Sequence, residues 1–76
     1  MILALGNAAD PAAVPALREG LHSLTPDCRA LCAWALGEIG TKQAEEALLE
    51  REREETEPAV LAELRQAKEK ITGKHP

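Results

Sequence analysis

The feature that most constrains the fold of this chain is an internal repeat. When the sequence is shifted by 31 positions, residues of the same type coincide at places expected to be structurally equivalent, such as helix ends and apolar stripes. The coinciding pairs are Ala4/Ala35, Leu5/Leu36, Gly6/Gly37, Ala13/Ala44, Ala16/Ala47, Leu17/Leu48, Glu19/Glu50 and Thr25/Thr56. A period near thirty residues with two helices per unit is typical of an α-solenoid.

Cap residues and prolines predict the first hairpin. Asp10 followed by Pro11 indicates a helix that runs to about residue 21, with its first turn tightened by Pro15. The same signal at residues 25–26 predicts a second helix that ends near residue 36, with Gly37 as its left-handed stop.

The same signals predict a second hairpin and fix the expected organisation. Thr41 caps a third helix through about residue 55, and Thr56 caps a fourth that ends at Gly73. We therefore expect an all-α fold, a solenoid fragment with two helical hairpins in a single domain over residues 1–76. The repeats span approximately residues 10–37 and 41–72, and residues 1–6 are the end of a preceding helix. The chain is expected to be a piece of a longer protein.

The apolar residues predict which helix faces are buried. They are mainly Ala and Leu, with one Trp and no Phe or Tyr, which suits closely packed helices. Trp34 is expected to fill the core between the repeats, the alternative being a platform on which a base stacks. The other positions expected to be buried are Val14, Leu17, Leu21, Ala44, Ala47, Leu48, Val60, Leu61, Leu64, Ala67 and Ile71.

Charge and targeting signals predict a cytoplasmic, non-membrane chain. The net charge of −4 argues against a strongly basic nucleic-acid module but leaves room for a local basic patch. The first five residues lack the charged leader of a signal peptide, and no stretch approaches the roughly 18 apolar residues of a membrane span. Two cysteines without an export signal are typical of a reducing compartment.

Residues 27–40, which read Asp-Cys-Arg-Ala-Leu-Cys-Ala-Trp-Ala-Leu-Gly-Glu-Ile-Gly, resemble the short HEAT repeat named after phycocyanobilin lyases. Residues 4–7, 10–17 and 33–37 together resemble the C-terminal HEAT-like segment of the epoxyqueuosine reductases. The resemblance extends over about residues 3–67. The sequence departs from the pattern at Cys28, where Val is usual, and at Leu61, where the second repeat would carry Arg.

This resemblance implies a non-catalytic role. The reductases use cobalamin and four-iron clusters to modify tRNA, and all of that chemistry belongs to domains that precede the HEAT-like segment. The segment itself helps to hold the tRNA, so no cofactor is expected in this chain. The resemblance therefore implies a substrate-holding module with tRNA as its partner. The alternative is a protein–protein interaction scaffold of the HEAT type.

Four basic residues are candidates for phosphate contact. Arg29 and Arg65 fall on the second helices of the two hairpins, the layer expected to line the concave side, and Lys68 and Lys70 extend that line. The glutamate-rich third helix is expected to lie on the other side. These four residues, here called the basic strip, form the expected tRNA-binding site. The alternative is that cations near a helix end only complement its dipole.

Three further patterns carry no expected chemistry. The cysteine pair lacks the four ligands of a zinc or cluster site and is interpreted as buried packing. A single Glu-x-x-His cannot build a di-iron site, and the glutamates one turn apart are interpreted as a solvated face. We expect no catalytic and no metal residues. The residues concerned are Cys28, Cys32, Glu19, His22, Glu46, Glu50 and Glu54.

The N-terminal end predicts self-association. Residues 1–5 read as a cut helix that carries Ile2, Leu3 and Leu5, and a solenoid end normally needs a polar cap. We expect two copies to pair through this apolar strip.

Overall fold

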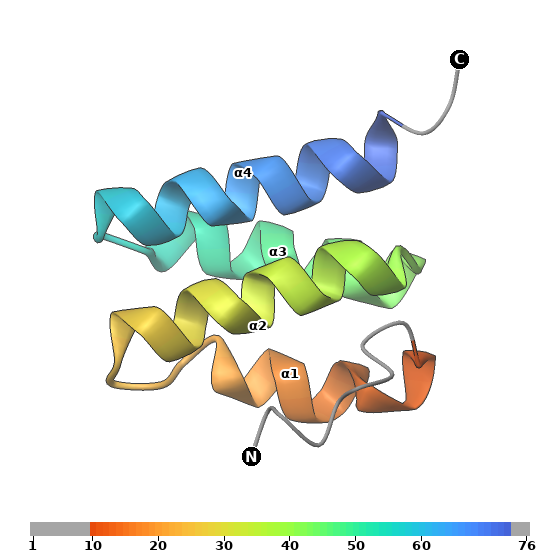
Figure 1. The fold of residues 1–76 in the computed structure, drawn as a ribbon, viewed down its shortest axis with the longest axis horizontal. Helices are drawn as coiled ribbons and strands as arrows, with labels where there is room; N and C mark the ends of the chain where they lie inside the picture. Colours follow the sequence, from red (N-terminus) through yellow and green to blue (C-terminus); the bar gives the residue numbers. More distant parts are fainter. Residues whose placement is uncertain (1–9, 74–76) are drawn as a thin grey trace.

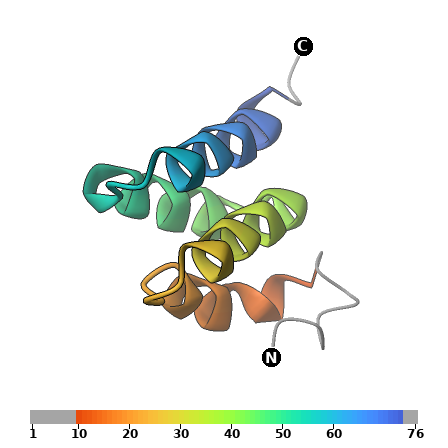
Figure 2. The ribbon, with the colours of Figure 1, turned by 60° about the vertical axis from the view of Figure 1, so that its left-hand side comes forward.

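The structure is a computed structural model that describes residues 10–73. Within this range the chain is helical, and Figures 1 and 2 show two stacked hairpins in which α2 and α4 run in one direction and α1 and α3 in the other. The elements are a 3₁₀ turn η2 (Pro11–Ala13), α1 (Val14–Gly20), α2 (Pro26–Ile39), α3 (Lys42–Glu54) and α4 (Pro58–Thr72). The expected all-α solenoid fragment is confirmed.

Proline shapes the first helix as predicted. The Asp10 carboxylate accepts a hydrogen bond from the Ala12 N–H at 3.0 Å and so caps η2. Pro15 lies in the first turn of α1, where its missing N–H leaves no helical bond unmade. The stretch expected as one helix therefore divides into a tight 3₁₀ turn and a seven-residue α-helix.

Two of the predicted helix boundaries are wrong. Gly37 does not end α2, which continues to Ile39, and the left-handed stop is Gly40 with φ of 71°. Thr56 does not cap α4, because that helix begins at Pro58 with Glu57 at the cap position. By contrast, the Thr41 hydroxyl accepts a bond from the Ala44 N–H at 3.2 Å and caps α3 as expected.

One face of each helix contributes to a continuous apolar core. The predicted stripes of α1 and α3 are buried, and in α4 only Leu61 is half-buried instead of buried. Ala16 is exposed although its repeat partner Ala47 is buried, so equivalent positions of the two repeats can differ in burial. The largest fully buried side chains are Leu17, Leu21, Leu36, Leu48, Leu64, Val60 and Cys32.

Small residues bring α2 and α4 into close contact. A Cβ atom placed on Gly37 would lie 2.9 Å from the Cβ and 3.0 Å from the Cα of Ala67. Real Cβ atoms do not approach other atoms so closely, so the distance between the helices requires glycine here. Gly37 thus serves packing between the hairpins and not helix termination.

Candidate binding surface on α2 and α4

The structure places the basic strip on the second helices, as the sequence predicts, but Arg29 makes structural contacts there. Its guanidinium donates to both carboxylate oxygens of Glu55, from Nε at 2.9 Å and from Nη2 at 3.1 Å. Its Nη1 donates to the backbone carbonyl of Ser23 at 2.7 Å. Only 13% of the Arg29 side chain is exposed. Arg29 therefore ties together the turns of the two hairpins.

Glu55 is the centre of this cluster and was not anticipated from the sequence. Its side chain is fully buried and accepts a second charged bond from Arg51 Nε at 3.0 Å. The Glu57 N–H donates to the other carboxylate oxygen at 3.1 Å. We call Glu55, Arg29 and Arg51 the turn cluster. The available signal was Arg29 itself, a cation inside the apolar run of α2 that needs a partner.

The turn cluster controls the ionisation of Glu55. Burial alone would raise the pKa of this carboxyl, but the bonds from Arg29, the Glu57 N–H and Arg51 stabilise the ionised form. The pKa of Glu55 is consequently held below its ordinary value. The pKa of Glu52 is also lowered, mainly by the hydrogen bond from Lys68 and further by Arg65.

These two carboxyls predict a loss of stability in acid. Because their pKa values are below 4.5 in the folded chain, ionisation stabilises the fold above pH 4.5, and this contribution is lost as pH falls through the folded values. Urea unfolding measured between pH 7 and about pH 3 should show the decline, and Glu55→Gln should reduce it. An unfolding free energy that is independent of pH over this range would contradict the assignment.

The three α4 members of the basic strip are also paired. Glu52 from α3 accepts from Lys68 Nζ at 2.7 Å and from Arg65 Nε at 3.4 Å. Lys70 pairs with Glu38 at the end of α2. The expectation that the glutamates of α3 lie away from the strip is therefore wrong for Glu52, because its side chain reaches α4.

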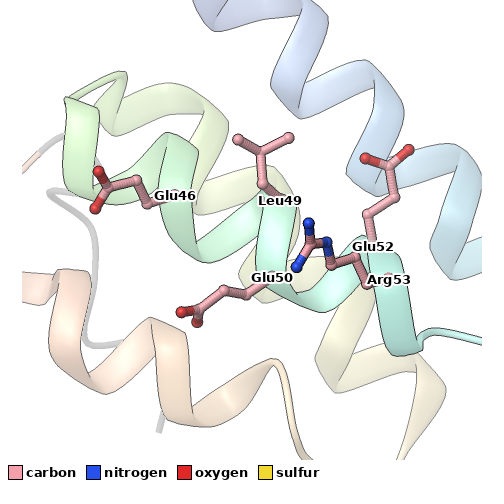
Figure 3. A pocket seen from close by; sticks show the side chains of 5 residues that line it. All are labelled: Glu46, Leu49, Glu50, Glu52 and Arg53. Atoms are coloured by element: carbon pink, nitrogen blue, oxygen red, sulfur yellow. The ribbon is translucent and has the colours of Figure 1, made fainter.

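The carboxylates of α3 form an open, solvated surface. Figure 3 shows Glu46 and Glu50 on successive turns of α3, Leu49 directed to another side of the helix than Glu50, and Glu52 directed toward α4. They line a shallow hollow of about 430 Å³. Glu50 is paired with Arg18 at 2.7 Å. Glu46, Glu50 and Glu54 are exposed to solvent, as the sequence interpretation expected, whereas only 22% of the paired Glu52 side chain is exposed.

The cysteine pair packs in the core. Cys32 is buried against Gly20, because a Cβ atom added to Gly20 would lie 2.3 Å from the Sγ of Cys32. Cys28, one turn earlier, is half-buried. Burial, and then the neighbouring Cys28, raise the pKa of Cys32 to about 12. Within residues 10–73 no three His, Cys, Asp or Glu side chains are grouped to hold a metal ion.

Trp34 is half-exposed, with 46% of its surface accessible, so the expectation that it fills the core is wrong. The buried positions of α2 are instead occupied by Cys32, Ala33, Ala35, Leu36 and Gly37. Leu31, one turn earlier, is 42% exposed. The apolar strip of residues 1–5, which was expected to drive self-association, lies outside the described range.

Two hollows flank Trp34 on the exposed side of α2 and α4, here called the α2–α4 surface. One, of about 360 Å³, is lined by Asp27, Ala30, Leu31, Trp34 and Glu63. The other, of about 220 Å³, is lined by Trp34, Glu63, Gln66, Ala67 and Lys70. This surface combines an exposed aromatic ring with carboxylates. Sequence reasoning missed it because it assigned Trp34 to the core.

Comparison with known families agrees with this architecture. A family model described as HEAT repeats matches residues 1–68. No curated protein and no solved structure matches the chain. None of the helices within residues 10–73 is long and apolar enough to cross a bilayer.

Proposed function

The chain belongs to the HEAT-repeat family, and from that premise we propose that it is a non-catalytic binding module whose partner is a polypeptide. HEAT repeats commonly mediate protein interactions, and stacked helical repeats present extended surfaces suited to such partners. The α2–α4 surface is the binding face in this proposal.

One observation carries the proposal: every residue of the basic strip is already bonded to a carboxylate. Arg29 is bonded to Glu55, and the three cations of α4 are bonded to Glu52 and Glu38. A phosphate would have to displace these carboxylates or lie close to them, which weakens its attraction. The exposed ring of Trp34 and the neighbouring Leu31 offer the apolar contact that polypeptide partners use.

A second candidate is the tRNA-holding role implied by the resemblance to the epoxyqueuosine reductases. The run of cations on α4 favours this candidate, because the Arg65 side chain in that run is 68% exposed. In this candidate cobalamin and the iron–sulfur clusters belong to other domains of a cytoplasmic parent protein, and the chain contributes electrostatic contacts alone.

The proposal is tested by selecting a displayed random-peptide library on the immobilised full chain, with bulk tRNA in excess as competitor. We expect peptides that are enriched over an unrelated helical protein and that remain bound in the presence of tRNA. The proposal is overturned if no peptide is enriched.

The tRNA candidate predicts a different dependence on the basic strip. Because the chain would contribute electrostatic contacts alone, bulk tRNA should bind no tighter than the non-specific range of about 10⁻⁴ to 10⁻⁶ M and weaken steeply with salt. Changing Arg65, Lys68 and Lys70 together to Ala should weaken it further and leave the selected peptides bound. Filter binding over a salt series measures both. Binding of tRNA that survives the triple change, or no binding even at low salt, would exclude the basic strip as a tRNA contact.

A further inference from the structure

The α2–α4 surface also indicates the chemistry of its partner. Resting on the proposed polypeptide-binding function, we propose that this surface binds a basic peptide segment, with an arginine or lysine against the ring of Trp34 and an apolar side chain against Leu31. Both residues are more than two-fifths exposed and lie one helical turn apart on α2. They therefore offer one continuous contact.

Charge decides which segment fits. Asp27 and Glu63 line the hollows beside Trp34, and neither forms an ion pair with another residue in the range 10–73. Lys70 also lines one hollow, but its charge is balanced by Glu38. An exposed indole next to unpaired carboxylates attracts a guanidinium or ammonium group by cation–π and ionic contact together.

The same charges disfavour two other occupants. A single-stranded nucleic acid could stack a base on Trp34, but its phosphates would meet Asp27 and Glu63. A second copy of the chain brings a net charge of −4 to a surface that is itself acidic. A basic peptide is the occupant whose charge complements this surface.

Trp34 makes the proposal directly measurable. It is the one Trp in a chain without Tyr or Phe, so all aromatic fluorescence comes from the proposed site. Titrating the full chain with a peptide of alternating arginine and leucine should change the Trp34 emission saturably. The matched peptide with glutamate in place of arginine, and polyuridylate as single-stranded RNA, should produce no saturable change.

Charge reversal on α4 supplies the decisive comparison. Glu63→Lys should weaken the arginine–leucine peptide about tenfold or more, equivalent to about 1.4 kcal/mol. Glu69→Lys is the matched control, because Glu69 lies on the same helix outside both hollows and should change affinity less than twofold. Trp34→Ala, followed with a labelled peptide, should also weaken binding. Circular dichroism verifies that each variant is folded.

The outcomes distinguish the basic-peptide assignment from the polypeptide-binding function on which it rests. Preference for the glutamate peptide or for polyuridylate, or equal effects of Glu63→Lys and Glu69→Lys, would overturn the basic-peptide assignment. If the library selection nevertheless enriches peptides that are not basic, the polypeptide-binding function stands and this assignment alone fails. If the library yields no binder, both fail.

Discussion

Replacing Glu55 with alanine is expected to lower the free energy of unfolding by about 3 to 5 kcal/mol, enough to unfold much of so small a chain. The change removes the partner of Arg29 and Arg51 in the turn cluster and the acceptor for the Glu57 N–H. The two guanidiniums remain largely buried, with side chains only 13% and 15% exposed. A charge left buried without its partner is strongly destabilising. Urea unfolding followed by circular dichroism measures the loss.

The neighbouring residue supplies the control for this prediction. Glu54 is the last residue of α3, its side chain is 67% exposed, and its contact with Arg51 is 3.8 Å long. Glu54→Ala should change stability by less than about 1 kcal/mol. If Glu55→Ala and Glu54→Ala unfold at the same urea concentration, Glu55 does not hold the two turns together.

Changing Gly37 to valine is expected to destabilise the chain by about 3 kcal/mol, at the upper end of overpacking effects. A side chain at this position meets both the Cβ and the Cα of Ala67, and the backbone atom cannot move aside without shifting α4. Removing a helical glycine ordinarily favours a helix, so propensity predicts the opposite sign. Thermal unfolding of Gly37→Val distinguishes the two expectations.

The close contact can be verified by a compensating change. Gly37→Ala should be destabilising alone, and adding Ala67→Gly should recover part of the loss by removing one of the two clashing atoms. Ala62→Val, at an exposed position of α4, should cost less than about 1 kcal/mol and controls for branching in a helix. A Gly37→Ala variant more stable than the parent would show that α2 and α4 have room between them.

Local signals were sufficient to predict the helices. Asp10, Pro11 and Thr41 act within a few residues of themselves, so their effects could be predicted without knowing the fold. Apolar spacing likewise predicted the buried faces of α1 and α3. The packing role of Gly37 could not be predicted locally, because it depends on the contact with Ala67 in the other hairpin.

The candidate site depended on contacts between distant residues and was predicted less well. Arg29 and Glu55 are 26 positions apart, and no sequence period pairs them. The four cations were correctly placed on second helices, but their carboxylate partners come from α2, α3 and the α3–α4 turn. Trp34 was misplaced because an aromatic residue among alanines fits a core by composition, whereas in the structure it lies on the exposed side of α2.

Because Cys32 is buried, the reactivity of its thiol reports on opening of the first hairpin. With a pKa of about 12, its thiol is almost wholly protonated at neutral pH, and the surrounding core shields it from reagents. Separation of α1 from α2 would return it to an ordinary thiol with a reactive thiolate fraction. The alkylation rate of Cys32 therefore measures how often the first hairpin opens. The half-buried Cys28 beside it is accessible to reagents without such opening.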